Sequence, residues 1–277
     1  MRVGFIGTGS MGSILIEAFI QSGALNPEHI VATNRTISKV ERLAATYSGL
    51  KVARSNIDVV RDCDILFLCV KPVEFKAVID DIKDEAAPEQ IIVSITSPVL
   101  IRQLEDLLGS KIAKIIPSIT NFVFSGATLC VYSDRMADED IERLENLLSH
   151  ISAPIRISEE NTRISSDLSS CGPAFLAFFI QKFIDASVEE TGISREEATQ
   201  LASEMTLGTG KLLTTGGFSP ESLQKSVAVP GGITAEGLHM MEKELCGLFN
   251  NLIHTTHAKY EEDLEKVEAR FFGTKVE

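Results

Sequence analysis

The first twelve residues constrain the fold of this 277-residue chain more than any other stretch. An apolar run over residues 3–6 predicts a buried strand, and apolar side chains at helical spacing over residues 13–22 predict a helix. Between them stand Gly7, Gly9 and Gly12. In a strand–turn–helix, glycines at this spacing permit a tight turn, a close approach of a pyrophosphate to the backbone, and helix–strand packing. The stretch therefore predicts a dinucleotide site whose phosphates face the free N–H groups of the helix start; the alternative is a glycine-rich turn without a ligand.

The end of the second predicted strand indicates which dinucleotide is bound. Residues 30–33 predict this strand, and Asn34, Arg35 and Thr36 follow it. NAD enzymes usually place an acidic residue here for the ribose 2′-hydroxyl, and this chain has none. A guanidinium with polar neighbours suits a 2′-phosphate, so NADP is predicted, with NAD as the alternative. The other interpretation is that Arg35 is an exposed residue before the helix predicted from Ser38 onward.

Further apolar stretches recur along the first part of the chain. They predict strands over residues 51–52, 64–70, 91–95, 114–117, 127–132 and 155–157. Strands that alternate with amphipathic helices predict an α/β fold with a doubly wound parallel sheet. Lys71 follows one of these strands, at the sheet edge where ligands bind in open α/β sheets.

The chain changes character after the last predicted strand. We expect an N-terminal dinucleotide-binding domain over residues 1–158 and a C-terminal all-helical domain over residues 159–277. The helices of the second part are predicted over residues 173–191, 194–213 and 234–268.

The first of these helices carries an apolar run over residues 175–180 that covers nearly its whole circumference. Such a helix is typically buried on every side. Because little chain is left to cover it within one copy, we expect a subunit interface. The predicted assembly is a homodimer through the C-terminal helices, with a higher homo-oligomer as a further option.

Composition limits the partners and the location. A net charge of −13 argues against nucleic acid, which requires clustered Lys and Arg. Five cysteines without CxxC spacing suggest neither a disulfide framework nor a zinc site. The N-terminus lacks signal-peptide features, and no segment is expected to reach the roughly 18–20 apolar residues of a membrane span. We therefore expect a cytoplasmic protein that does not bind membranes.

Two glycine-containing stretches of the second part are candidate substrate sites. Residues 169–175 predict a small-residue turn into a helix, with Pro173 in its first turn. Residues 229–237 predict a glycine turn that opens another helix, with Thr234 at the N-cap. In the structural interpretation the Thr234 hydroxyl satisfies backbone N–H groups. In the functional one, amides at this helix start bind a substrate carboxylate while the hydroxyl meets the reacting group.

Two further groups are weaker candidates. His254 and His257, with Glu261 one turn on, have the helical spacing of metal ligands, but solvated surface residues are the simpler interpretation and no metal site is predicted. Cys171 has no neighbouring histidine in the sequence, which favours a small packing residue over a nucleophile.

In their order and spacing, the motifs resemble those of the pyrroline-5-carboxylate reductase family. The resemblance runs nearly end to end and rests on Gly7-x-Gly9-x-x-Gly12, Asn34-Arg35, Asn56, Val70-Lys71-Pro72, Gly172-Pro173-Ala174 and Pro230-Gly231-Gly232-x-Thr234. It implies a Rossmann domain followed by a helical domain that interlocks in a dimer. It also implies NAD(P)H-dependent reduction of the cyclic imine of 1-pyrroline-5-carboxylate to proline by hydride transfer.

The resemblance implies roles for individual residues. Thr234 is the hydroxyl that hydrogen-bonds the imine nitrogen. Gly232 and Ile233 offer backbone N–H groups to the carboxylate, with Gly231 and Cys171 also beside the substrate. The residues implied to bind the cofactor are Gly7, Thr8, Gly9, Ser10, Met11, Gly12, Asn34, Arg35, Thr36, Asn56, Val70, Lys71 and Pro72.

The chain departs from the family pattern on the substrate side. Cys171 and Phe175 stand in place of Ser and Tyr, Val229 and Ile233 replace hydroxyl residues, and Ser118 stands where the family has Asn. A lost hydrogen bond to a charged group costs about 1.5–3 kcal/mol, so these changes shift the substrate or weaken the activity. The pattern resembles a branch of the family encoded beside bacterial competence genes. The alternative function is therefore a cofactor-binding paralogue with a regulatory, competence-related role and little or no reductase activity.

Overall fold

The computed structural model describes residues 1–273, and the chain divides into two compact units. The first unit combines residues 1–173 with those from Thr256 onward, and the second spans residues 174–255. The expected division of the sequence at residue 158 remains a prediction.

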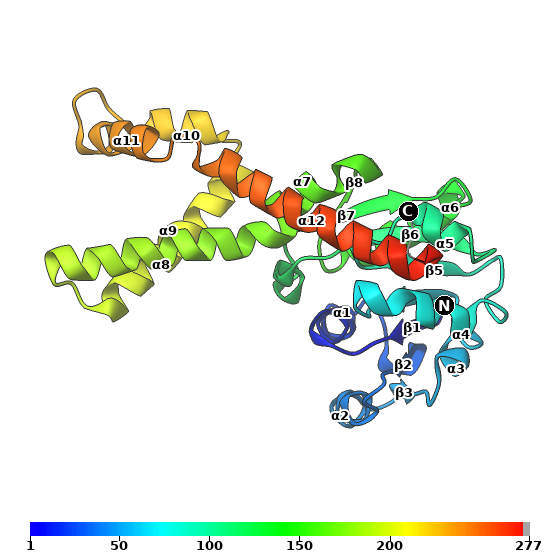
Figure 1. The fold of residues 1–277 in the computed structure, drawn as a ribbon. Helices are drawn as coiled ribbons and strands as arrows, with labels where there is room; N and C mark the ends of the chain where they lie inside the picture. Colours follow the sequence, from blue (N-terminus) through cyan, green and yellow to red (C-terminus); the bar gives the residue numbers. More distant parts are fainter. Residues whose placement is uncertain (274–277) are drawn as a thin grey trace. The chain divides into compact units, whose positions relative to one another are not determined.

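Within the described residues, the first unit is built on an eight-stranded sheet (Figure 1). Its strands are β1 (Val3–Ile6), β2 (Ile30–Thr33), β3 (Lys51–Val52), β4 (Ile65–Leu68), β5 (Ile91–Ser94), β6 (Lys111–Ile116), β7 (Ala127–Tyr132) and β8 (Ala153–Arg156). They lie in the order β3-β2-β1-β4-β5-β6-β7-β8, and neighbours among β1 to β6 pair in parallel. The predicted α/β fold with a mainly parallel, doubly wound sheet is confirmed.

Strand β7 departs from the prediction because it pairs antiparallel with β6. Only residues 117–126 join the two strands, with a 3₁₀ turn at Ile119–Val123. A parallel crossover needs about a dozen or more residues and usually a helix, so this short connection favours the antiparallel pairing. Strand β8 is parallel to β7, and helix α6 (Asp138–Ser149) lies between them in the chain.

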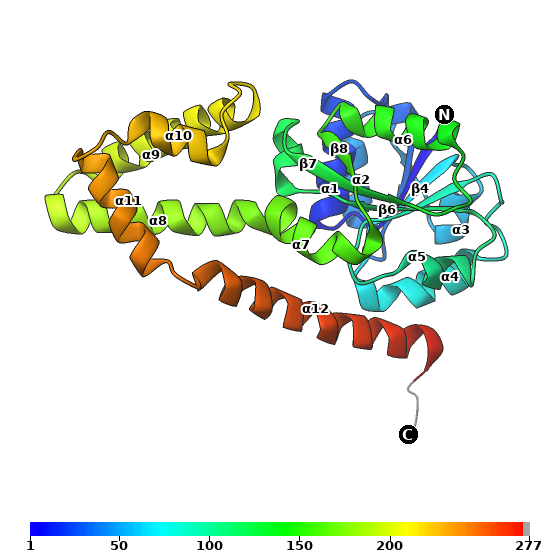
Figure 2. The same cartoon turned by 90° about the horizontal axis from the view of Figure 1, so that it is seen from above.

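Helices cover both faces of this sheet (Figures 1 and 2). One face packs against α1, α2 and α6, around the stacked rings of Phe5 and Phe67. The other face packs against α3, α4, α5 and the end of α12, which contributes Val267 and Phe271 to this core. The helices are α1 (Ser10–Gln21), α2 (Ser38–Thr46), α3 (Asn56–Val60), α4 (Phe75–Ile82), α5 (Ile101–Glu105) and α12 (Leu248–Phe272).

The small-residue turn predicted over residues 169–175 is wrong, because this stretch is helical throughout. Pro173 has no N–H and therefore cannot donate to the carbonyl of Ser169, four residues earlier. The helix widens into a π turn just before the proline, and the Ser118 hydroxyl donates to that carbonyl at 3.1 Å. The successive segments are α7 (Thr162–Ser166), the π turn (Asp167–Cys171) and α8 (Gly172–Thr191).

The helical segment Glu159–Thr191 is long and apolar enough, by length and composition, to cross a membrane. Its most apolar window has a mean hydropathy of 1.2 and is 6% buried. The prediction that no segment would meet this criterion is therefore wrong. A single such helix is weak evidence for a membrane, because helices at the core of soluble proteins meet the same criterion.

The described residues of the second unit form helices joined by short loops. Its helices, besides α8 and the start of α12, are α9 (Arg195–Thr214), α10 (Pro220–Val227) and α11 (Ile233–Glu244). The single helix predicted over residues 234–268 is two helices, because Gly247 adopts a positive φ of 77° between them. Within one chain, α8 leaves Leu176, Phe178 and Phe183 more than half exposed, so the predicted burial of this helix does not occur inside one copy.

Candidate functional site

The glycine turn between β1 and α1 has almost no room for side chains. Gly7 has a φ of 101°, and a Cβ there would lie 2.4 Å from the Cys69 carbonyl oxygen. A Cβ on Gly12 would lie 2.2 Å from the carbonyl oxygen of Gly7, so the third glycine permits the helix to pack on the turn. Gly9 faces open space, which leaves the backbone accessible to a ligand.

The N-terminus of α1 has free backbone N–H groups that can bind an anion. Its N-cap, Gly9, supplies no side-chain hydrogen bond, so the first N–H groups lack a side-chain cap. The Thr8 hydroxyl is buried and has no hydrogen-bond partner among the described residues. The Thr8 N–H donates to the Asn34 side chain at 3.2 Å, and Asn34 in turn donates to the Thr36 carbonyl at 3.1 Å. An unpaired buried hydroxyl beside uncapped amides fits a bound phosphate.

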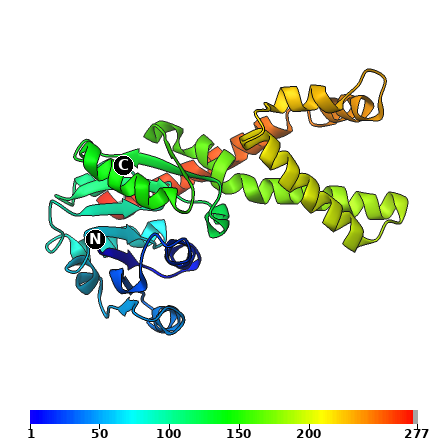
Figure 3. The same cartoon turned by 180° about the vertical axis from the view of Figure 1, so that it is seen from behind.

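A hollow of about 400 Å³ lies beside this helix start, and α1 and α2 are seen nearly end-on in blue in Figure 3. Lys39 and Arg42 of α2 bring positive charge to it, and sequence reasoning missed both. The available signal was two basic residues three apart on one helix face. The hollow is lined by Thr8, Gly9, Ser10, Ser13, Glu17, Lys39, Arg42, Leu43 and Thr46.

Arg35 lies outside this lining. Its side chain is 88% exposed and donates to Glu74 at 2.9 Å. Exposed ion pairs contribute about 0–1 kcal/mol, so the guanidinium can readily exchange this carboxylate for a phosphate. Asn56 also lies outside the lining and donates to Asp81 on α4 at 3.0 Å.

The segment after β4 lies against the glycine turn. Val70 would contact a Cβ on Gly7 at 3.2 Å, and the exposed Lys71 precedes a 3₁₀ turn that begins at Pro72. Burial raises the pKa of the neighbouring Cys69 thiol, so this cysteine stays protonated and acts as a packing residue. Met11 of α1 packs against the core on the α1 face of the sheet.

In the second unit, the start of α11 also lacks a side-chain cap. Its N-cap is Gly232, so the prediction of Thr234 as N-cap is wrong; Thr234 is the second residue of the helix. Gly231 has a φ of 71° and directs the chain into the helix. The side chain of Ile233 is 95% exposed, and Val229 is also exposed. The Thr234 hydroxyl is thus not used as the N-cap of its own helix.

Cys171 belongs to a polar cluster in the first unit that sequence reasoning missed. Its sulfur accepts a hydrogen bond from Arg163 at 3.1 Å, and Arg163 pairs with the buried Asp167 at 2.8 Å. Thr256 donates to Asp167 at 2.7 Å, and His257 lies 3.8 Å from the same carboxylate. The sequence contains these residue types, but it does not show that side chains of α7 and α12 contact one another.

Among the described residues, no group of three His, Cys, Asp or Glu side chains has the arrangement of a metal site.

The fold and the glycine turn define a dinucleotide-binding α/β protein with an attached helical unit, and comparisons with known proteins identify its relatives. Residues 2–98 match the family described as NADP oxidoreductase, coenzyme F420-dependent, and residues 159–263 match pyrroline-5-carboxylate reductase dimerisation. The chain is 40% identical to ComE operon protein 4 of Bacillus subtilis over 98% of this chain and 99% of that protein.

Two further relatives carry the name of the reductase. A pyrroline-5-carboxylate reductase of Methanosarcina acetivorans is 31% identical over 87% of this chain and 90% of that protein. The crystal structure of Plasmodium falciparum pyrroline carboxylate reductase with NADP bound aligns with a TM-score of 0.80 at 26% identity, covering 99% and 98% of the two chains. The chain belongs to the pyrroline-5-carboxylate reductase family.

Proposed function

We propose that the chain is an NADPH-dependent reductase that converts 1-pyrroline-5-carboxylate, or a related cyclic imine, into proline or the corresponding amine. The observation that carries this proposal is the uncapped start of α1, with the unpaired Thr8 hydroxyl beside it, in a member of this family. Bound NADPH would supply the hydride for the imine carbon and would be left as NADP⁺. The π electrons of the C=N bond move to the nitrogen, which takes a proton, so that a C–H and an N–H bond form.

The first unit would hold the cofactor. Glycine-turn backbone, the α1 amides and the Thr8 hydroxyl would bind the pyrophosphate, while Arg35 and Lys39 would bind the 2′-phosphate. The full set proposed to bind the cofactor comprises Gly7, Thr8, Gly9, Ser10, Met11, Gly12, Asn34, Arg35, Thr36, Asn56, Val70, Lys71 and Pro72, with Lys39 and Arg42 added from the hollow.

The start of α11 would hold the substrate. Its uncapped N–H groups, including those of Gly232 and Ile233, suit a carboxylate, and the Thr234 hydroxyl would hydrogen-bond the imine nitrogen. Gly231 and Cys171 complete the proposed set. Positioning of the imine carbon against the cofactor supplies most of the rate advantage in such a reaction, because no covalent enzyme intermediate is required.

A second candidate function is a cofactor-binding paralogue with a regulatory role. Two observations favour it: the apolar side chains of Val229 and Ile233 flank the start of α11, and the chain is 40% identical to a protein named for the ComE operon. In this case NADPH would bind without turnover of the imine.

The reductase proposal is tested by NADPH oxidation with freshly prepared 1-pyrroline-5-carboxylate. A robust rate that collapses in Thr234→Ala, but not in a Thr199→Ala control on α9, supports it. Protein that binds NADPH and shows no rate contradicts it and supports the regulatory function.

We also propose that two copies associate through the second unit, in the cytoplasm. Phe179 and Phe249 stack at 6.0 Å beside an apolar groove of about 150 Å³, and α8 exposes further aromatic side chains. The match to the family's dimerisation domain over residues 159–263 supports a second copy as the partner that covers this surface. Light scattering should show a dimer that Phe178→Glu dissociates and an exposed control, Glu196→Lys, leaves intact.

A further inference from the structure

Arg163 of α7 is a largely buried side chain whose hydrogen-bond donors are only partly used. It is 16% exposed, and its Nη2 atom donates to the buried Asp167 at 2.8 Å and to the sulfur of Cys171 at 3.1 Å. Asp167 and Cys171 are the first and the last residue of the π turn. The Nε atom of Arg163 is buried and has no hydrogen-bond partner among the described residues. One nitrogen of the guanidinium is therefore engaged, while a buried N–H remains unused.

The neighbouring groups of this cluster do not satisfy that N–H. Both carboxylate oxygens of Asp167 already accept hydrogen bonds, Oδ1 from Arg163 and Oδ2 from the Thr256 hydroxyl at 2.7 Å. The Nε2 atom of His257 lies 3.8 Å from Oδ2, too far for a hydrogen bond, and is also buried without a partner. Unpaired buried donors are rare in native proteins, because each forfeits the hydrogen bond that it makes in water. The cluster therefore fits a ligand that supplies an acceptor oxygen.

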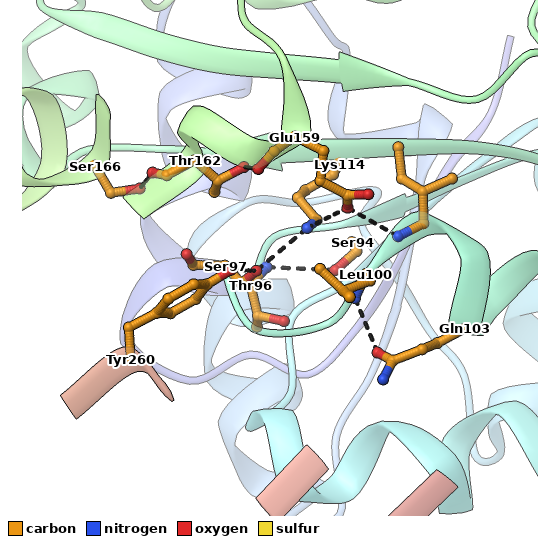
Figure 4. Close-up of polar contacts among 11 residues, drawn as sticks. Ser94, Thr96, Ser97, Leu100, Gln103, Lys114, Glu159, Thr162, Ser166 and Tyr260 are labelled. Atoms are coloured by element: carbon orange, nitrogen blue, oxygen red, sulfur yellow. Dashed lines mark hydrogen bonds and ion pairs between the residues drawn. The ribbon is translucent and has the colours of Figure 1, made fainter. Parts of the chain in front are cut away.

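The cluster is anchored at the carboxyl edge of the sheet. The guanidinium carbon of Arg163 lies 5.8 Å from the ring centroid of Tyr260, on α12. The Tyr260 hydroxyl and the buried ammonium of Lys114, on β6, both donate to the Ser97 carbonyl, just after β5, at 3.2 Å (Figure 4). The Ser118 hydroxyl, just after β6, holds the π turn at 3.1 Å. Ligands of open α/β sheets bind outside these strand ends.

The position of the cluster indicates which ligand meets it. The glycine turn and α1 follow β1, whereas β5 and β6 belong to the second mononucleotide half of the sheet. A dinucleotide with its pyrophosphate at α1 directs its reacting end toward this second half. An acceptor group that reaches Arg163 therefore belongs to the substrate beside that end. A guanidinium binds a carboxylate through charge-assisted hydrogen bonds, which are roughly twice as strong as neutral ones.

We propose that Arg163 is a specificity-determining residue that binds the carboxylate of the imine substrate, and that Asp167 is the positioning residue that fixes its guanidinium. The inference rests on the proposed function, since it requires an imine substrate at this edge of the sheet. Asp167 acts through Arg163 and does not itself touch the substrate. The carboxylate is then a feature by which the chain selects its substrate, and cyclic imines that lack it are poor substrates.

The test compares NADPH oxidation by the full-length protein with two imines that share a ring, 1-pyrroline-5-carboxylate and 1-pyrroline, which lacks the carboxylate. Arg163→Gln retains a donor for Asp167 but removes the charge. Its KM for 1-pyrroline-5-carboxylate should rise about tenfold, while kcat and both constants for 1-pyrroline stay unchanged. Arg163→Lys restores the charge without the planar fork, so its KM should rise by less.

Two further variants complete the test. Asp167→Asn removes the charge that orients Arg163, and it should raise the same KM if Arg163→Gln does not fold. The matched control is Arg143→Gln, on α6, which removes the charge of an arginine that pairs with Asp140 at 3.0 Å. All constants of this control should equal those of the wild type.

Each outcome decides for or against the assignment. A KM increase confined to 1-pyrroline-5-carboxylate in the Arg163 and Asp167 variants, and absent in Arg143→Gln, supports it. Equal losses for both imines, a loss in kcat alone, or no loss in Arg163→Gln overturns it, because a purely structural arginine predicts these patterns. Wild-type protein that reduces both imines equally well overturns this inference alone. Wild-type protein that reduces neither imine overturns the proposed function, and this inference with it.

Discussion

Replacement of Arg35 by alanine should weaken NADPH binding and leave NADH binding unchanged. The Arg35 side chain is 88% exposed and already pairs with Glu74, so a 2′-phosphate must displace that carboxylate. Breaking an exposed pair costs at most about 1 kcal/mol, whereas a charge-assisted hydrogen bond contributes about 1.5–3 kcal/mol. The difference, about 0.5–2 kcal/mol, corresponds to an affinity loss of about two- to thirtyfold.

Because Glu74 competes with the phosphate for Arg35, a change at Glu74 should have the opposite effect on NADPH affinity. Glu74→Gln removes the competing charge and leaves Arg35 free for the phosphate. NADPH affinity should therefore rise by up to about fivefold, with no change for NADH. A purely structural Arg35–Glu74 pair predicts that both variants lose affinity together.

The assay is a titration followed by the fluorescence of the reduced nicotinamide, at low and high salt. Arg54→Ala is the matched control, because Arg54 is also exposed and pairs with a glutamate, Glu41, at 3.6 Å. The Arg35 effect should shrink at high salt, since ions screen an exposed phosphate contact. Equal losses of NADPH and NADH affinity in Arg35→Ala would refute the assignment of Arg35 to the 2′-phosphate.

Three further variants test individual contacts of the first unit. Gly12→Ala places a Cβ 2.2 Å from a backbone carbonyl, so NADPH binding should be lost by calorimetry; retained affinity would contradict the tight packing of the turn. Ser118→Ala leaves the Ser169 carbonyl without its 3.1 Å donor and should lower the free energy of unfolding in urea by about 1–3 kcal/mol, which an unchanged midpoint would disprove. The hydrogen bond from Arg156 lowers the pKa of Glu145 from 4.5, so its stabilisation is present above that pH and is lost as the pH falls through the lowered value. The difference in melting temperature between wild type and Arg156→Gln should therefore narrow as the pH falls below 4.5, and a constant difference would count against the pair.

Several features of the fold follow from local sequence. The apolar runs predict the parallel strands to within a few residues, because buried parallel strands require continuous hydrophobic side chains. The GxGxxG spacing predicts a turn that the structure shows to be sterically restricted to glycine at Gly7 and Gly12. In these cases the determining contacts lie within a few residues or within one strand–turn–helix.

Other features depend on contacts that local patterns do not contain. The Ser169 carbonyl in the π turn before Pro173 accepts its side-chain hydrogen bond from Ser118, 51 residues away in the sequence. The break at Gly247 interrupts an amphipathic pattern that otherwise continues from α11 into α12. Periodicity alone therefore predicted one helix where the backbone forms two.

In the candidate site, too, some features follow from local sequence and others from contacts between distant segments. The sequence alone determined the dinucleotide turn, the basic residue after β2 and the family to which the chain is related, since these depend on residue type and spacing. Only the tertiary structure brought Lys39 of α2 to the start of α1, and Lys114 of β6 under the turn that carries Ser97. A buried charge such as Lys114 is stable only where distant segments supply its partners, and the fold alone decides which segments meet.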